Sequence, residues 1–145
     1  MTSLFTKIIQ GELPGRFVWA DELAVGFLTI EPLRPGHVLV VPRQEVDHWI
    51  DLEPALAAHL NEIARLLGHA LMEAFEPVKV GLMIAGLEVR HTHLHVVPIH
   101  ALHDLNFARA DKNATPEALD DAAARIRAAL RAQGRSGVAE GPTPA

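Results

Sequence analysis

The segment HTHLHVVP, residues 91–98, carries three histidines within five residues and decides how the rest of the chain is interpreted. Its alternation of residues, ended by a proline, predicts a β-strand, and the side chains of a strand point to opposite faces in turn. His91, His93 and His95 therefore share one face, each about 7 Å from the next along the strand. The residues between them face the other way, into the expected core.

Three imidazoles on one face have chemical uses that packing alone does not explain. Each ring carries two nitrogens that need partners, and burying them unpaired is costly. Imidazole acts as a nucleophile, a proton carrier or a metal ligand, and a phosphorus centre suits the nucleophile. Two alternatives stay open from the triplet alone: the histidines bind zinc or another divalent ion, or they form a purely structural polar network.

Periodicity and turn residues divide the rest of the chain into short strands and helices. Apolar residues at spacings of three and four predict long helices over 53–75 and 117–132, and a short helix is expected over 3–10. Strands are expected over 16–20, 24–30, 37–41, 78–85 and 92–98. The connections favour an α+β fold, a five-stranded antiparallel sheet with two main helices. We expect one domain over 1–133 and a disordered tail, rich in Gly and Pro, over 134–145.

Composition limits the classes of function. The chain has 145 residues, 49% hydrophobic, with a formal net charge of −5 and no cysteine. Disulfides and thiolate metal sites are therefore impossible, and a net negative chain is a poor partner for a nucleic-acid polymer. Neither a signal peptide nor a run of about 18 apolar residues is recognisable. We expect a cytoplasmic protein without a membrane or nucleic-acid partner.

The triplet resembles the motif of the histidine-triad superfamily, His-φ-His-φ-His-φ-φ with φ apolar, and Thr92 stands at the first φ position. Further resemblance covers residues 4–100 in the right order: FTKIIQGELP at 5–14, FLTIEP at 27–32, PGHVLVVP at 35–42 and Ala85-Gly86 before the triad. The chain is most similar to the bacterial histidine triad nucleotide-binding proteins, which implies the histidine-triad fold.

The resemblance assigns roles to four histidines. In the family the middle histidine of the triad is the nucleophile, and that role falls on His93. The outer two, His91 and His95, would orient the nucleophile and contact phosphate. His37 matches a fourth family histidine, which lies against the triad. The alternative for His37 is a histidine at a strand end without a role.

The resemblance also implies a nucleoside pocket, where this chain departs from the family. Leu28, Thr29 and Ile30 would line it. Family members often carry an acidic residue at the position of Thr29, and it accepts hydrogen bonds from both ribose hydroxyls. A threonine hydroxyl makes fewer such bonds, without charge, and Glu31 is a candidate to contribute instead.

A second departure lies before the triad, where the family commonly has Gly-Gln-Ser/Thr-Val and this chain has Gly86-Leu87-Glu88-Val89. Gly86, Glu88 and Val89 are predicted to contact the substrate. An ionised carboxylate beside a phosphate repels it, so Glu88 either faces away or assists proton transfer to the leaving group.

The implied function is a nucleotide-binding hydrolase that cleaves nucleoside 5'-phosphoramidates or related nucleotide conjugates, such as those of AMP, through a nucleotidyl-histidine intermediate. A purine nucleotide or conjugate is the expected ligand, and a homodimer the expected assembly. Some members bind zinc through N-terminal cysteines, which are absent here, so we expect no metal and no cofactor. The alternatives are a nucleotide-binding or interaction module with little catalysis, a nucleotidyl transferase of the same superfamily, and a metalloprotein built on the histidine row.

Overall fold

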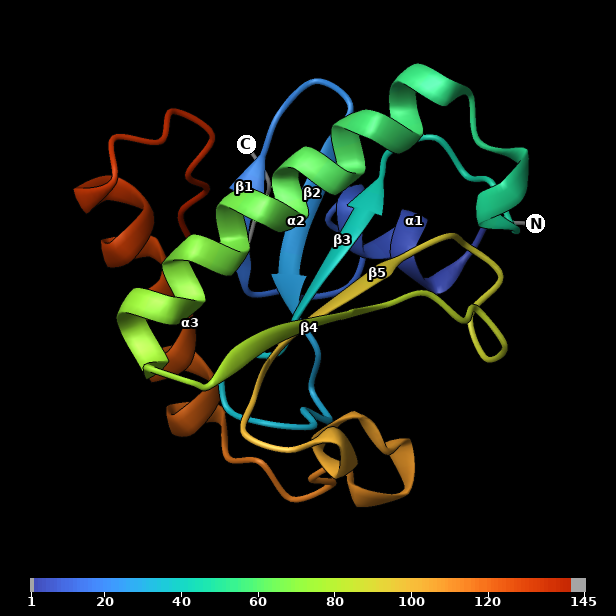
Figure 1. The fold of residues 1–145 in the computed structure, drawn as a ribbon. Helices are drawn as coiled ribbons and strands as arrows, with labels where there is room; N and C mark the ends of the chain where they lie inside the picture. The colour runs from blue at the N-terminus through green and yellow to red at the C-terminus, as the bar shows by residue number, and fades with distance from the viewer. Residues whose placement is uncertain (1, 142–145) are drawn as a thin grey trace.

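The computed structural model describes residues 2–141, which form one five-stranded sheet in the order β1-β2-β3-β5-β4 (Figure 1). Every neighbouring pair of strands is antiparallel. The strands are β1 (Phe17–Ala20), β2 (Ala24–Leu28), β3 (Val38–Pro42), β4 (Lys79–Met83) and β5 (Leu94–Ile99). The predicted five-stranded antiparallel sheet and α+β class are confirmed.

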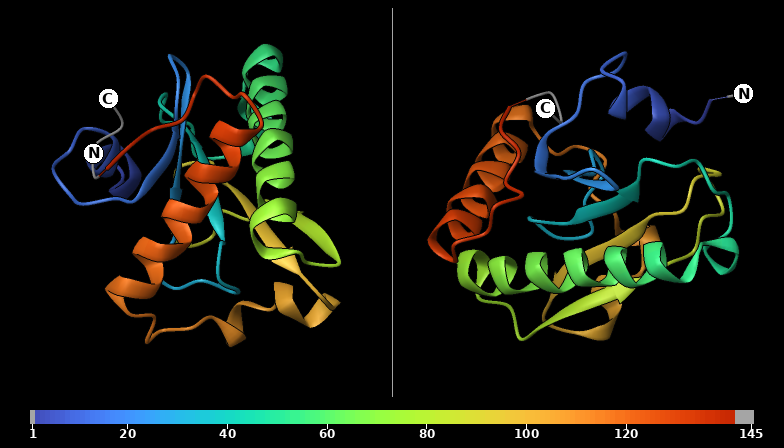
Figure 2. Two further views of the ribbon diagram at one scale, coloured as in Figure 1. Left: turned by 90° about the vertical axis from the view of Figure 1, so that its left-hand side faces the viewer. Right: turned by 90° about the horizontal axis from the view of Figure 1, so that it is seen from above.

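Three α-helices cover the two faces of this sheet: α1 (Leu4–Ile9), α2 (Pro54–Phe75) and α3 (Pro116–Ala132). Figure 2 shows α2 and α3 on one face and α1 on the opposite face. Pro54 opens α2, where its missing N–H costs no helical hydrogen bond, and Glu76 ends it in the left-handed conformation. Short 3₁₀ turns lie at Trp49–Asp51, Leu102–Leu105 and Phe107–Arg109.

Alternating residues of β3 enter two separate cores. Val38 and Val40 pack with the apolar faces of α2 and α3, whereas Leu39 and Val41 pack with Phe5 of α1 and its neighbours. Because both faces of the strand are covered, all of its residues are buried, and its sequence is a continuous apolar run. Each fully buried aliphatic side chain contributes about 1.5–3 kcal/mol.

The start of β5 differs from the prediction. The strand was expected from Thr92 but begins at Leu94, and β3 pairs with it only over residues 94–96. Thr92 instead donates its backbone N–H and its hydroxyl to the carbonyl oxygen of Val46, at 2.7 and 2.8 Å. The first half of the histidine segment is therefore anchored to the loop that follows β3.

The prediction of a disordered tail is wrong for the part that the structure describes. The N–H of Ala139 donates to the carbonyl oxygen of Val18, and the N–H of Ala20 donates to the carbonyl oxygen of Gly137. The segment around residues 137–139 therefore lies along β1. Gly137 rests on the ring of Trp19, where a Cβ atom would overlap the indole. Gly137 belongs to the composition that predicted disorder, yet it is required for close packing against Trp19. Residues 142–145 lie outside the described residues.

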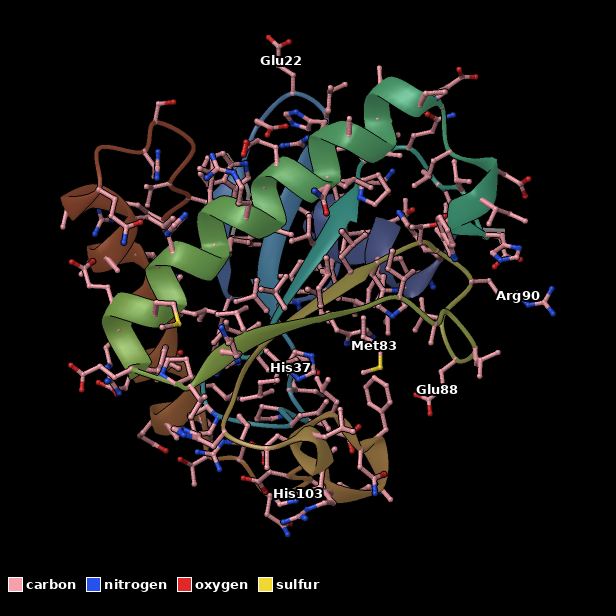
Figure 3. The ribbon with its side chains drawn as sticks, in the orientation of Figure 1. Glu22, His37, Met83, Glu88, Arg90 and His103 are labelled. Carbon is pink, nitrogen blue, oxygen red and sulfur yellow. The ribbon has the colours of Figure 1, made fainter. Side chains whose placement is uncertain are left out.

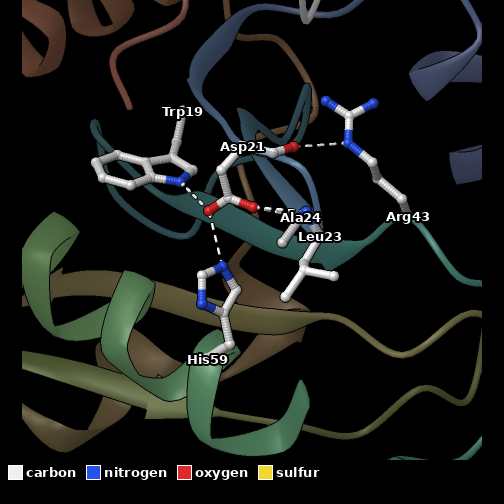
Figure 4. A network of polar contacts seen from close by, with 6 residues as sticks. All are labelled: Trp19, Asp21, Leu23, Ala24, Arg43 and His59. Atoms are coloured by element: carbon white, nitrogen blue, oxygen red, sulfur yellow. Dashed lines mark hydrogen bonds and ion pairs between the residues drawn. The ribbon is translucent and has the colours of Figure 1, made fainter. Parts of the chain in front are cut away.

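Asp21 joins the β1–β2 hairpin to helix α2 (Figure 4). One carboxylate oxygen accepts backbone N–H bonds from Leu23 and Ala24, at 2.8 and 2.9 Å. The other accepts from the indole of Trp19 at 2.9 Å and lies 2.8 Å from Nε2 of His59 on α2. This cluster fixes the hairpin on the side of the sheet away from α1, so His59 has a structural partner far from the triad.

Among residues 2–141, none of the helices combines the length and the apolar character needed to cross a bilayer.

Candidate functional site

A cavity of about 270 Å³ opens on the face of the sheet that carries α1, beside the end of β2. Two histidines of the triad, His93 and His95, reach this cavity. Their side chains point to the opposite face of the sheet from those of Leu94 and Val96, which lie in the core with α2. The lining residues are Phe5, Thr29, Glu31, His37, Leu39, Glu88, His93, His95, Phe107, Ala110 and Lys112.

His93 is held by its own segment in a defined tautomer. Its Nδ1–H donates to the carbonyl oxygen of His91 at 2.7 Å, and a carbonyl can only accept, so the proton is on Nδ1. The unprotonated Nε2 therefore carries the lone pair. Phe5 packs edge-on against the ring, with centroids 4.8 Å apart. Burial has the largest effect on the pKa of His93 and lowers it, so the ring stays neutral. The bond to the His91 carbonyl and the charge of Glu88 act in the opposite direction.

His95 is held in the opposite tautomer by His37. The backbone N–H of Leu33 donates to Nδ1 of His37 at 3.0 Å, so the proton of neutral His37 is on Nε2. That Nε2–H donates to Nδ1 of His95 over 2.9 Å, which leaves the Nε2 of His95 protonated. His93 thus offers a lone pair while His95 offers an N–H donor, with ring centroids 4.8 Å apart.

Burial enforces the neutral state of this pair. Desolvation, with the nearby rings of His95 and His93, lowers the pKa of His37 to about 3. Desolvation and the proximity of His93 lower the pKa of His95 to about 4. Gly36, at φ 96°, turns the chain directly before His37 and packs on the Phe75 ring, so a side chain there would be strained.

His91 lies elsewhere than expected. Its ring is fully buried, Nε2–H donates to the carbonyl oxygen of Pro42 at 2.7 Å, and Nδ1 lies 2.6 Å from the hydroxyl of Ser3. The ring therefore has no nitrogen free to contact phosphate, and a row of three metal ligands does not form. Its backbone carbonyl accepts the Nδ1–H of His93, so only part of the expected role fits the geometry. Across residues 2–141 there is no group of three or more acidic or histidine side chains arranged to hold a metal ion.

Of the residues predicted at the end of β2, Thr29 and the further candidate Glu31 line the cavity, whereas Leu28 and Ile30 do not. Leu28 points into the α2 side of the core because successive side chains of a strand alternate, and Thr29 shares the face of Phe27. Ile30 is 69% exposed and does not line the cavity. The Thr29 hydroxyl oxygen accepts the backbone N–H of Glu31 at 3.2 Å, which leaves its proton available to a ligand.

The loop between β4 and β5 contributes one predicted residue. Glu88 lines the cavity, whereas Gly86 and Val89 do not, and Val89 instead packs against the α1 core. Figure 3 shows Glu88 and Arg90 on this loop, with Arg90 directed away from the molecule. Glu88 is therefore the carboxylate of this loop that faces the cavity.

Sequence reasoning missed five lining residues. Leu39 could have been found, since alternation puts it on the face of the histidines. Phe5 and Phe107 contact the rings of His93 and His95 edge-on, at centroid distances of 4.8 and 4.9 Å. Phe107, Ala110 and Lys112 come from an irregular segment after the sheet, and no local pattern marks them as neighbours of the triad.

Fold and site together define an α+β protein whose alternating histidines present one neutral imidazole with a free lone pair beside one imidazole donor. The chain belongs to the HIT domain family, whose pattern matches residues 10–102. An uncharacterized HIT-like protein of Borreliella burgdorferi is 32% identical over 116 residues, 75% of this chain and 84% of that protein. The adenylylsulfatase HINT3 of Arabidopsis thaliana is 28% identical over 100 residues, 66% of this chain and 51% of that protein.

Solved structures agree on the fold. A hypothetical histidine triad nucleotide-binding protein from Sulfolobus tokodaii superposes with a TM-score of 0.80 at 24% identity, over 90% of this chain and 93% of that one.

Proposed function

We propose that this protein hydrolyses nucleoside 5'-phosphoramidates or related nucleotide conjugates through a nucleotidyl-histidine intermediate at His93. One observation carries the proposal: the bond from His93 Nδ1 to the His91 carbonyl leaves Nε2 unprotonated in a cavity that also holds His95. A neutral imidazole with a free lone pair is the form that attacks phosphorus.

In the first step, Nε2 of His93 forms a bond to phosphorus and the bond from phosphorus to the leaving group breaks. The imidazole gains positive charge, which the 2.7 Å bond from its Nδ1–H to the His91 carbonyl stabilises. His95 donates its Nε2–H to a non-bridging oxygen, and His37 keeps that donor in place. A departing amine takes up a proton that comes from solvent, and Glu88, which lines the cavity, is the candidate to relay it.

In the second step, water forms a bond to phosphorus and the bond from His93 to phosphorus breaks. The attacking water releases one proton to solvent, a nucleoside 5'-monophosphate leaves, and His93 returns to its neutral form. If an acceptor other than water attacks, the same intermediate gives nucleotidyl transfer. Transfer differs from hydrolysis only in which molecule reaches the phosphorus from the open side of the cavity.

The nucleoside end of the substrate fits the side of the cavity formed by Thr29, Glu31 and Leu39. The Thr29 hydroxyl and the Glu31 carboxylate are polar partners for ribose, and Leu39 offers an apolar floor. Two similarities support this class of substrate: one relative is named an adenylylsulfatase, and one structural neighbour is named a nucleotide-binding protein. We propose AMP, a purine nucleotide, as the nucleotide part.

A binding module with little catalysis is the second candidate, and Glu88 favours it. An ionised carboxylate at the mouth of the cavity repels a phosphate, whereas Lys112 attracts one. If the repulsion dominates, nucleosides bind and phosphorus stays out of reach of His93.

The deciding experiment is intact-protein mass spectrometry after brief exposure to an adenosine phosphoramidate at mildly acidic pH, with rapid quenching. We expect a transient adduct of one AMP, followed by free AMP. Neither adduct nor AMP, together with AMP binding by calorimetry, would shift the function to the binding module.

We further propose a homodimer, formed through the unpaired edge of β4. A surface hollow of about 490 Å³ lies between α2 and β4, and exposed apolar side chains line it, among them Met72, Val78 and Leu82. An open strand edge beside an apolar patch favours pairing with a second copy.

The variant Leu82→Lys is expected to be monomeric at concentrations where the wild type is dimeric, because it places a charge in the proposed interface. Sedimentation equilibrium measures the difference. Leu23→Lys is the matched control, because Leu23 is 50% exposed, close to the 48% of Leu82, and lies on the β1–β2 hairpin. A wild type that stays monomeric at all accessible concentrations contradicts the dimer.

A further inference from the structure

A second polar cluster lies behind the triad, outside the cavity, where helix α1 begins. Ser3 caps this helix by accepting the backbone N–H of Thr6 at 3.0 Å. The same hydroxyl lies 2.6 Å from Nδ1 of His91. A residue 88 positions away in the chain thus contacts the first histidine of the triad.

The direction of the bond between Ser3 and His91 follows from the other side of the ring. Nε2 of His91 must carry a proton, because its partner is the carbonyl oxygen of Pro42. Burial lowers the pKa of His91, so the ring is neutral and Nδ1 is the acceptor. The Ser3 hydroxyl therefore donates to it, and both ring nitrogens are held.

Glu45 fixes Ser3 in turn. One oxygen of its carboxylate accepts the backbone N–H of Ser3 and the hydroxyl of Thr6, each at 2.7 Å. Those two bonds hold the pKa of Glu45 below its ordinary value, so the acceptor is ionised at neutral pH. The start of α1 is thus attached to the loop after β3, the loop that also anchors Thr92.

We propose that Ser3 is a positioning residue for the nucleophile and that it acts through His91. Its hydroxyl fixes the imidazole of His91, and the fixed residue directs its backbone carbonyl at the Nδ1–H of His93. The inference rests on the proposed function of His93 and adds a role for a residue that touches neither the substrate nor the cavity. Without the hydroxyl, Nδ1 of His91 is a buried acceptor whose nearest remaining donor is the Thr6 hydroxyl, 3.5 Å away and already donating to Glu45, and the ring reorients.

Helix capping is the competing explanation for Ser3, and two variants separate it from positioning. Glycine is nearly as good an N-cap as serine, whereas alanine is a poor one. Ser3→Gly therefore removes the bond to His91 but keeps most of the cap, and Ser3→Ala removes both. Ser3→Thr keeps the hydroxyl and the cap.

The experiment combines single-turnover kinetics of AMP transfer to His93 with ¹⁵N NMR of the imidazoles in the free protein. In Ser3→Gly and Ser3→Ala we expect the transfer rate to fall about tenfold with little change in substrate affinity, and Ser3→Thr to recover it. The NMR signals of His93 should show a proton spread over both nitrogens in the first two variants, and on Nδ1 in the wild type and Ser3→Thr.

A Ser3→Gly variant with the wild-type rate and the wild-type His93 tautomer would reduce Ser3 to a helix cap and overturn the inference. The two arms also separate this inference from the proposed function. If the wild type forms no adduct, the proposed reaction fails, yet the NMR measurement on the free protein still decides whether Ser3 sets the tautomer of His93.

Discussion

Replacing His93 with alanine is expected to lower the rate of turnover by a factor of about 10⁴ or more and to abolish the AMP adduct. Of the three histidines that line the cavity, only His93 presents an unprotonated nitrogen to it, because His95 presents a proton and His37 is bonded on both nitrogens. AMP affinity, measured by calorimetry, should change little, since the proposed contacts of the nucleoside are with Thr29, Glu31 and Leu39.

His103→Ala is the control for this substitution. His103 lies in the 3₁₀ turn after β5 with its side chain 57% exposed, and it does not line the cavity (Figure 3). The turnover rate of His103→Ala should equal that of the wild type. Because the ring of His93 is nearly buried, the thermal midpoint of each variant shows whether the fold is retained. Undiminished turnover in folded His93→Ala would eliminate the nucleotidyl-histidine mechanism.

Acid is expected to unfold this protein at an unusually high pH because its buried histidines resist protonation. The folded pKa values of His37 and His95, about 3 and about 4, lie below the value of 6.5 for an unperturbed ring. As the pH falls below about 6.5, the unfolded chain therefore binds protons that the native chain does not. The stabilisation by the neutral histidines is complete above about pH 6.5 and is lost as the pH falls. The loss ends near the folded pKa values of His95 and His37, about 4 and about 3.

Urea unfolding at a series of pH values measures this loss. Each histidine contributes a slope of about 1.4 kcal/mol per pH unit, so the pair gives about 3 kcal/mol per unit between roughly pH 6 and 4.5. The variant His37→Gln keeps an amide N–H for His95 but cannot titrate, so its slope should be smaller by about 1.4 kcal/mol per unit. The control His48→Gln changes an exposed ring and should leave the slope unchanged. Parallel curves for wild type and His37→Gln would contradict buried neutral histidines as the cause.

Local alternation explains why so much of the site was predictable. The period of two along a strand puts His93 and His95 on one face and Leu94 and Val96 on the other, and this needs no knowledge of the partner strands. The same rule separates Leu28 from Thr29, and applying it at the end of β2 would have removed Leu28 from the predicted pocket.

Long-range contacts explain what the sequence left undecided. The glycine-rich segment 134–141 was predicted to be disordered, yet it pairs with β1, because the ring of Trp19 provides a flat surface that only a glycine can approach so closely. Phe107 and Lys112 reach the cavity through an irregular segment whose course depends on the whole fold.

The sequence by itself therefore determined the fold class and the histidine pattern, because strand and helix periods are local properties of the chain. The role of His93 as nucleophile follows from the family resemblance and stays a proposal. Only the tertiary structure decided the tautomers of His91 and His95 and the direction of their rings. The partners of His91 stand 49 and 88 residues away, and that of His95 58 residues away. A hydrogen-bond donor and its acceptor are chosen by proximity in space, which no local period encodes.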